Sequence, residues 1–295
     1  LCIKACAYDA ITLVDKKAVI NERCTICGAC VSACRYDAIV IERRPFKGQD
    51  VASYAGICVF AEHRHGALSS VVFEIVGAAR ELKKDLERPI SAILVGAKVR
   101  AMAEELLAYG VDEVWMVEDP AIGDFAEDIQ TDLVTKILLD KKPEIFLGGG
   151  TILGRSLLPR VAARILTGLT ADCTELSVDG EKQLLKQTRP AFGGNIMATI
   201  LCNNHRPQMA TVRHKVMKAA PRGEAGASGK IVELSYPILK PRIEVLEFVP
   251  EQTETVNLAD ADFIVSGGRG LKDPKNFAVI EALAKAIGGA VGASR

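Results

Sequence analysis

The chain has 295 residues, 49% of them hydrophobic, a size that suits about two or three domains with a sizeable core. Lysine plus arginine and aspartate plus glutamate both number 37, so the formal net charge of +0 gives no general case for nucleic-acid or membrane-surface binding. The sequence contains no apolar run of the ~18–20 residues that a membrane span needs and no visible signal peptide.

The first stretch that predicts chemistry is a run of cysteines. Cys24, Cys27, Cys30 and Cys34 are separated by two, two and three residues, which is the bacterial ferredoxin spacing, with Arg35 in place of the usual proline. In that motif the first three thiolates bind one [4Fe–4S] cluster and the fourth binds another. The first cluster therefore needs one ligand from elsewhere in the chain.

An internal repeat supplies that ligand. Residues 2–11 (CIKACAYDAI) recur as residues 30–39 (CVSACRYDAI), with a period of 28. By this symmetry Cys6 is the counterpart of Cys34, so we expect Cys6 to complete the first cluster. Cys2 and Cys34 would then belong to a second cluster whose other ligands precede the first residue. Because the chain opens in mid-motif and without methionine, we expect a fragment at this end.

Two alternative interpretations of the cysteines are weaker. A structural zinc site usually needs two separated cysteine pairs, and a disulfide framework is typical of small secreted chains. Nine cysteines without a targeting segment, six of them in the cluster motif, instead predict a protein of the reducing cytoplasm.

The cysteines lie in a small predicted domain at residues 1–46. Short β-type runs at 10–14 and 38–41 flank the cysteine loops, as in a ferredoxin-like α+β fold. The polar stretch 43–50, with Pro45 and Gly48, predicts a linker.

Residues 53–250 show a different pattern, in which short apolar runs alternate with segments of helical periodicity. We expect strands at 56–60, 90–95, 113–117 and 144–147, and helices at 68–86, 99–109, 128–140 and 154–166. Further strands are expected at 171–178, 184–187, 196–202, 208–212 and 243–249, with a loop at 219–229. This alternation predicts a doubly wound, mostly parallel α/β (Rossmann-like) domain.

A glycine-rich turn, Gly148–Thr151, joins a predicted strand to a predicted helix. Such a turn can seat a phosphate on the helix N-terminus. The Walker and G-x-G-x-x-G patterns are absent, and the glycines can equally serve a tight turn and close packing. The three cysteines outside the cluster motif, Cys58, Cys173 and Cys202, have apolar neighbours and are expected to be buried, inert thiols. The histidines show no metal-ligand spacing.

A third domain is predicted from residue 256, after the polar connector 250–256. A strand at 262–265 runs into Gly267-Gly268-Arg269-Gly270 and a helix at 274–287, the pattern of the first βα unit of a nucleotide-binding domain. Because about thirty residues cannot bury a core, we expect this domain, 256–295, to be cut short.

Three stretches resemble the α subunit of electron-transfer flavoproteins, over roughly residues 55–295. They are TGLTADCT (167–174), RPAFGGNIMAT (189–199) with RPQM (206–209), and SGGRG (266–270) with GASR (292–295). The fused cysteine unit further resembles a subset from anaerobic bacteria. Those proteins work with lactate dehydrogenase or caffeyl-CoA reductase in flavin-based electron bifurcation.

The resemblance implies an α/β domain that pairs with a β subunit and a C-terminal domain that binds FAD. The family's FAD-contacting residues correspond to Arg269, Ser294 and Arg295. A guanidinium there can bind phosphate, or stabilise a reduced anionic flavin by its charge. The plainer interpretation of Arg269 is a solvated turn residue. Because further FAD-binding stretches of the family lie beyond Arg295, only part of that site is expected here.

The sequence therefore predicts an electron-carrier subunit with no catalytic residue of its own. It would relay electrons through the [4Fe–4S] cluster between NADH or ferredoxin, flavin, and a partner flavoprotein dehydrogenase. The alternative is a non-bifurcating redox sensor or docking scaffold in which the cysteine domain is structural. The identity of the terminal dehydrogenase cannot be read from this chain.

Overall fold

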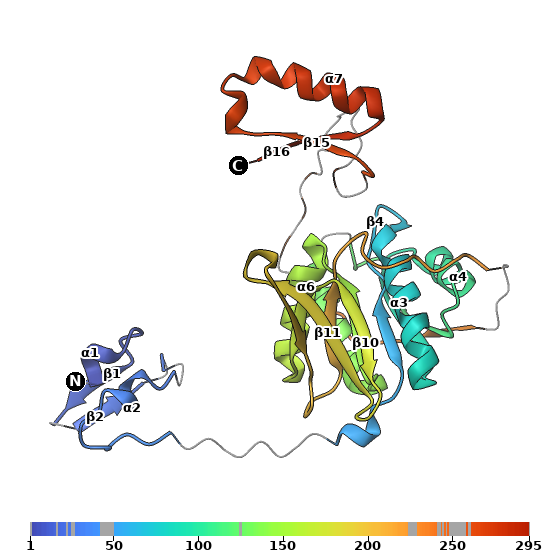
Figure 1. The fold of residues 1–295 in the computed structure, drawn as a ribbon. Coiled ribbons are helices and arrows are strands. Elements are labelled where there is room, and N and C mark those ends of the chain that lie inside the picture. Colours follow the sequence, from blue (N-terminus) through green and yellow to red (C-terminus); the bar gives the residue numbers. More distant parts are fainter. Residues whose placement is uncertain are drawn as a thin grey trace. The chain divides into compact units, whose positions relative to one another are not determined.

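The computed structural model describes residues 2–15, 17–21, 23–24, 27–41, 50–123, 126–223, 229–240, 243, 245, 247, 258 and 261–294. The chain divides into two compact units, Leu1–Gly48 and Gln49–Arg295 (Figure 1). The predicted linker at 43–50 lies outside the described residues except for its last residue, and the predicted boundary at 250–256 lies wholly outside them.

The described part of the first unit contains two short helices and one hairpin. Its elements are α1 (Cys2–Ala5), β1 (Ile11–Val14), β2 (Lys17–Ile20) and α2 (Ala29–Ser32). β1 and β2 pair antiparallel, with Ile11 opposite Ile20, so the first predicted β-type run is confirmed. The second was wrong, since residues 38–41 form no strand. A strand needs a partner for its backbone groups, and the repeat would place that partner at 45–48, outside the described residues.

The second unit is built on a seven-stranded sheet. Its strands lie in the order β14 (Lys230–Glu233), β7 (Glu113–Glu118), β6 (Ile90–Gly96), β3 (Ile57–Phe60), β8 (Ile145–Gly149), β13 (Gln208–Val212) and β9 (Leu169–Cys173). Every neighbouring pair is parallel. The predicted doubly wound α/β fold is confirmed.

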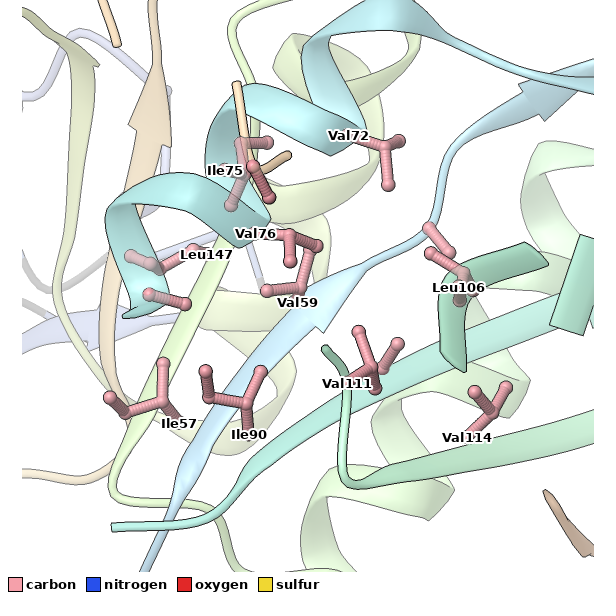
Figure 2. Packing of buried hydrophobic residues seen from close by; sticks show 14 of the residues in the cluster. Ile57, Val59, Val72, Ile75, Val76, Ile90, Leu106, Val111, Val114 and Leu147 are labelled. Carbon is pink, nitrogen blue, oxygen red and sulfur yellow. The ribbon is translucent and has the colours of Figure 1, made fainter. Parts of the chain in front are cut away.

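Helices cover both faces of this sheet. One buried cluster joins the sheet to α3 (Ser70–Leu86) and α4 (Arg100–Ala108), and a second joins it to α5 (Glu127–Lys141) and α6 (Ile152–Ile165). Along β3 the side chains alternate between the two, with Ile57 and Val59 in the first cluster and Cys58 and Phe60 in the second, because successive strand residues point to opposite faces. Figure 2 shows α3 and α4 packed over the first face.

A separate antiparallel sheet contains β10 (Glu175–Asp179), β11 (Leu184–Ala191) and β12 (Ile196–Ile200). The single strand predicted at 171–178 is therefore two strands. Its first part ends β9 in the parallel sheet, and its second part begins β10 in the antiparallel one, because the chain leaves one sheet for the other at Thr174. β14 was not predicted, since its four residues carry only two apolar side chains. Of the strand predicted at 243–249, the three described residues lie in no strand.

Two smaller elements complete the unit. A hairpin of β4 (His63–Arg64) and β5 (Ala67–Leu68) connects β3 to α3. Near the C-terminus, β15 (Ile264–Gly267), α7 (Phe277–Ile287) and β16 (Ala290–Ala293) form a βαβ module with parallel strands (Figure 1). This module confirms the predicted strand, glycine turn and helix. No helix in the described part of the chain is long and apolar enough to cross a membrane.

A matched pair of leucines on α5 tests the packing of the second face. Leu133 is fully buried and Leu139 is 52% exposed. We expect Leu133→Ala to lower the free energy of unfolding by about 2–5 kcal/mol, because it leaves a cavity, and Leu139→Ala to change it by less than ~0.5 kcal/mol. Urea unfolding followed by fluorescence of Trp115, which lies in the same buried cluster, measures both. Equal effects would contradict this placement of α5.

Candidate functional site

The six cysteines predicted as cluster ligands are all in the first unit, and all nine cysteines of the chain are free thiols. Cys2 lies in α1 and Cys30 in α2. Cys24 and Cys27 are exposed before α2, whereas the four cysteines of the repeat are half-buried. The predicted ligands are thus accessible thiols on helices and the segments beside them.

The internal repeat is also present in the backbone. Ala10 N–H donates to Cys6 Sγ at 3.3 Å, and 28 residues later Ala38 N–H donates to Cys34 Sγ at 3.4 Å. The intervening aspartates, Asp9 and Asp37, both adopt the left-handed conformation, with φ of 49° and 48°. Cys6 and Cys34 therefore occupy equivalent positions, as the sequence repeat predicts.

The electrostatics around Cys34 suit a metal ligand. Backbone N–H groups of Tyr36 and then Ala38 lower the pKa of its thiol. The thiolate is the form that binds iron, and hydrogen bonds to sulfur are among the factors that set the potential of iron–sulfur clusters.

Packing of the first unit also fits a bound cluster. Among its described hydrophobic residues only Ala10 and Ile11 are buried, while large side chains such as Tyr36 (86% exposed) and Val40 (79% exposed) are not. Domains this small generally depend on a metal, a disulfide or an oligomer for stability.

The structure does not itself assemble the ligand set. Within the described residues, no three His, Cys, Asp or Glu side chains lie close enough to hold a metal ion. The assignments of Cys6, Cys24, Cys27 and Cys30 to one cluster, and of Cys2 and Cys34 to another, therefore stay predictions.

The predicted flavin-contacting motifs meet in the C-terminal module. Gly267 and Ala293 are paired across β15 and β16, and Ser294 N–H donates to Gly267 O at 2.9 Å. A Cβ on Gly268 would collide with Ser294 Oγ. The glycine turn and the Ser294 hydroxyl thus lie side by side at the carboxyl ends of two parallel strands, where open α/β sheets bind their ligands.

Arg269 begins a short 3₁₀ turn, Arg269–Leu271, and is exposed beside this glycine turn. Its position fits a phosphate or flavin contact at the end of β15. Arg295 lies outside the described residues. The roles of Arg269, Ser294 and Arg295 in binding FAD remain predictions.

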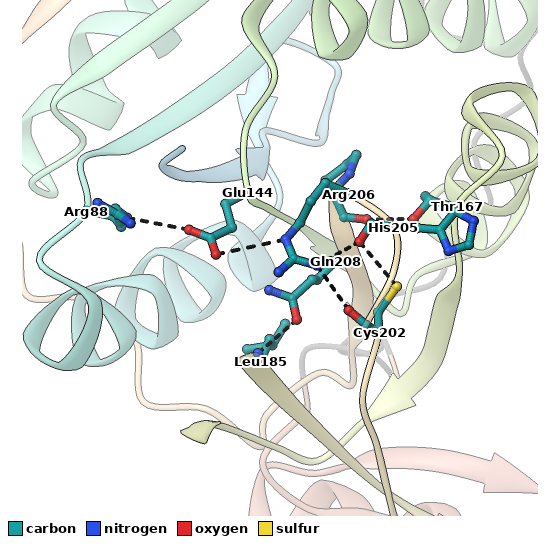
Figure 3. Close-up of polar contacts among 9 residues, drawn as sticks. Arg88, Glu144, Thr167, Leu185, Cys202, His205, Arg206 and Gln208 are labelled. Atoms are coloured by element: carbon teal, nitrogen blue, oxygen red, sulfur yellow. Dashed lines mark hydrogen bonds and ion pairs between the residues drawn. The ribbon is translucent and has the colours of Figure 1, made fainter. Parts of the chain in front are cut away.

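A buried ion pair, which sequence reasoning missed, explains another of the resemblance motifs. Arg206 is 7% exposed and donates to the carbonyls of Cys202 (3.1 Å) and His205 (2.9 Å). Glu144 lies between Arg206 and Arg88, with Nε–Oε distances of 3.9 Å and 3.5 Å (Figure 3). The RPQM motif therefore begins with an arginine that orders the loop before β13. The signal for this arginine in the sequence is a charged residue two positions before a buried strand.

The three cysteines outside the first unit, Cys58, Cys173 and Cys202, differ in how far they are buried. Burial raises the pKa of Cys58 to about 12 and that of Cys173 to about 11, so both are inert thiols as predicted. Cys202 is only half-buried, and its thiol donates to His205 O at 3.4 Å.

Comparison with family models matches three regions of the chain. Residues 57–239 match the electron transfer flavoprotein domain, and residues 257–295 match the electron transfer flavoprotein FAD-binding domain. Residues 17–40, which include Cys24 to Cys34, match the 4Fe-4S binding domain. The cofactors indicated by these domains, [4Fe–4S] and FAD, are those predicted from the sequence.

Curated relatives extend these matches. The electron transfer flavoprotein subunit alpha of Thermoanaerobacterium thermosaccharolyticum is 44% identical over 82% of this chain and 73% of its own length. The lactate dehydrogenase (NAD(+),ferredoxin) subunit LctC of Acetobacterium woodii is 37% identical over 98% of this chain and 69% of its own. The acryloyl-CoA reductase electron transfer subunit beta of Anaerotignum propionicum is 38% identical over 85% and 76%.

With its parallel α/β sheet, its glycine turn beside Ser294 and its added cysteine unit, the chain belongs to the electron transfer flavoprotein α-subunit family.

Proposed function

We propose that this chain is the α subunit of an electron-bifurcating complex of the cytoplasm, carrying electrons between NADH or ferredoxin, flavin, and a partner flavoprotein dehydrogenase. The observation that carries this proposal is the presence of a 4Fe-4S domain and an FAD-binding domain on one chain. A relative matched over 98% of the chain is named for lactate dehydrogenase, NAD(+) and ferredoxin.

The first unit would serve as the relay. A [4Fe–4S] cluster supplies one-electron transfer with little rearrangement. Cys6, Cys24, Cys27 and Cys30 would hold it, with Cys6 oriented by the N–H of Ala10. Cys2 and Cys34 would contribute to a second cluster. The equivalent sulfur contacts at Cys6 and Cys34 support the same kind of ligation at both.

The C-terminal module would bind FAD, which supplies both one- and two-electron chemistry. The backbone at Gly268 permits close approach of a pyrophosphate. Ser294 would donate a hydrogen bond to it, and Arg269 and Arg295 would place positive charge beside it. We place this module in a separate domain, 256–295, next to a docking domain at 53–250 and the cysteine domain at 1–46.

We propose two protein partners, a β subunit and a dehydrogenase, from the family and from the names of the relatives. Members of this family pair with a β subunit, and we propose that this chain does so through its α/β domain. The dehydrogenase would be of the lactate or acyl-CoA (caffeyl-CoA or acryloyl-CoA) type, since relatives are named for lactate dehydrogenase and acryloyl-CoA reductase.

The relay is tested by Cys27→Ala, with Cys202→Ala as a matched control outside the first unit. After reconstitution with iron and sulfide and reduction with dithionite, we expect a [4Fe–4S] EPR signal in the wild type and the control, but not in Cys27→Ala, because this variant lacks one of the four thiolates. In complex with the β subunit, Cys27→Ala should lose ferredoxin-linked turnover and keep NADH oxidation by an artificial acceptor. Undiminished ferredoxin-linked turnover would favour the alternative, a docking scaffold or redox sensor with a structural cysteine domain.

The flavin role is tested by Arg269→Ala, with the exposed Arg222→Ala as a control of equal charge change. Loss of positive charge beside the flavin should lower its reduction potential by tens of millivolts, where ~59 mV is a tenfold change in a one-electron equilibrium. Spectroelectrochemical titration of the FAD-loaded complex measures the shift. If Arg269→Ala and Arg222→Ala shift the potential equally, Arg269 is a solvated turn residue.

A further inference from the structure

The strand order of the parallel sheet reverses between β3 and β8. β6, β7 and β14 lie on one side of β3, and β8, β13 and β9 lie on the other. Doubly wound sheets bind ligands at such a point, outside the carboxyl ends of the strands. Here the segments that follow β3 and β8 meet at this point, since Thr151 Oγ1 lies 2.5 Å from Glu62 Oε2. The usual ligand position of the fold therefore contains a carboxylate of the chain itself.

Glu62 is linked to the N-terminus of α6 through Thr151. The Thr151 hydroxyl donates to Glu62 and accepts the N–H of Gly154 at 2.8 Å. A helix N-terminus attracts anions, because its N–H groups and its dipole both favour negative charge. Glu62 thus provides negative charge where a nucleotide phosphate would otherwise be attracted.

The hairpin that follows Glu62 covers the neighbouring strand end. His63 is buried and its Nε2 lies 3.0 Å from Val95 O, near the end of β6. A Cβ on Gly96 would lie 2.6 Å from the same nitrogen, so the imidazole fills the hollow above that glycine. Ser69 N–H closes the hairpin onto Glu62 O at 2.9 Å. Residues 62 and 63 therefore occupy the strand ends on both sides of β3.

Side chains fill the space beside the glycines at the end of β8. A Cβ on Gly148 would lie 2.7 Å from Leu158, and one on Gly149 would lie 2.9 Å from both Val71 and Thr151. It would also lie 3.5 Å from Glu62 Oε2. In a phosphate-binding loop the glycines make room for the ligand. Here they make room for the chain's own side chains, which supports the packing interpretation of Gly148–Thr151.

We infer that Glu62 closes the ligand crevice of the α/β unit by acting as an internal anion in the place of a nucleotide phosphate. This autoinhibitory contact keeps nucleotides away from the carboxyl edge of the seven-stranded sheet and leaves them to the glycine turn at 267–270. The unit keeps the topology of a nucleotide-binding domain. It rejects a nucleotide because the negative Glu62 carboxylate repels the negative phosphate. The inference does not depend on the proposed electron-transfer role.

A first measurement tests whether the carboxylate is desolvated in the crevice. Burial raises the pKa of Glu62, against the opposing effects of the Thr151 hydrogen bond and of His214, Arg64 and His63. A raised folded-state pKa means that stability contributed by the protonated form is lost as the pH rises from about 4.5. The stability of Glu62→Gln relative to the wild type should therefore increase over that rise. A pH-independent difference would place Glu62 in solvent and overturn the inference.

The decisive experiment measures AMP-dependent hydrogen–deuterium exchange of the intact chain, in peptides spanning residues 149–158. We expect slower exchange with AMP in Glu62→Gln and in Glu62→Ala, because both remove the negative charge, and no change in the wild type or in Glu104→Ala, an exposed control on α4. Binding of AMP at the 267–270 turn would not protect these peptides. Fluorescence of Trp115 shows whether each variant is folded. If Glu62→Ala does not fold, Glu62→Ser is used in its place, because its hydroxyl can still hydrogen-bond to Thr151. Protection in the wild type, or none in the folded small-residue variant, would overturn the inference.

Discussion

The structure depends on the central position of β3 in an all-parallel sheet. Every residue of β3 and β6 is buried, because α3 and α4 cover one face of the sheet and α5 and α6 the other. Parallel strands need long crossover connections, and the helices in those connections bury the two faces. All carboxyl ends therefore lie on one edge, where Glu62 meets Thr151.

The parts that carry redox chemistry have much smaller cores. In the described portion of the first unit, only Ala10 and Ile11 are buried hydrophobic residues, and on α7 only Ala284 is buried. Such modules gain stability from what they bind, since binding free energy of a metal or cofactor is also folding free energy. The chain thus combines an α/β unit that has two large buried clusters with two modules that bury few hydrophobic side chains in the part of the chain that the structure describes.

Glu62 shows how one fold can be used without its usual ligand. Its carboxylate, the Thr151 hydroxyl and the His63 imidazole occupy the crevice that the topology creates. The C-terminal module instead leaves Arg269 exposed beside its glycine turn. The strand ends beside Glu62 and beside Arg269 therefore differ in a few side chains, although both are carboxyl ends of parallel strands.

The amino-acid sequence by itself determined the local patterns. The 28-residue repeat predicted the equivalence of Cys6 and Cys34, which the two N–H···S contacts confirm. The alternation of apolar runs predicted α3 to α6 and the strands between them, because long periodic segments bury one face or two. The cysteine spacing predicted the [4Fe–4S] cluster, and the resemblance of short motifs, among them the glycine turn at 267–270, to a known family implied FAD.

Only the tertiary structure decided what depends on residues far apart in the chain. The division of 171–178 between two sheets, the edge strand β14 and the pairing of Glu144 with Arg206 follow from partners that no local pattern reveals. The choice between phosphate binding and packing at Gly148–Thr151 also depends on a residue that is distant in the sequence. It depends on Glu62, a residue 89 positions before Thr151, that parallel pairing of β3 and β8 brings to the same edge.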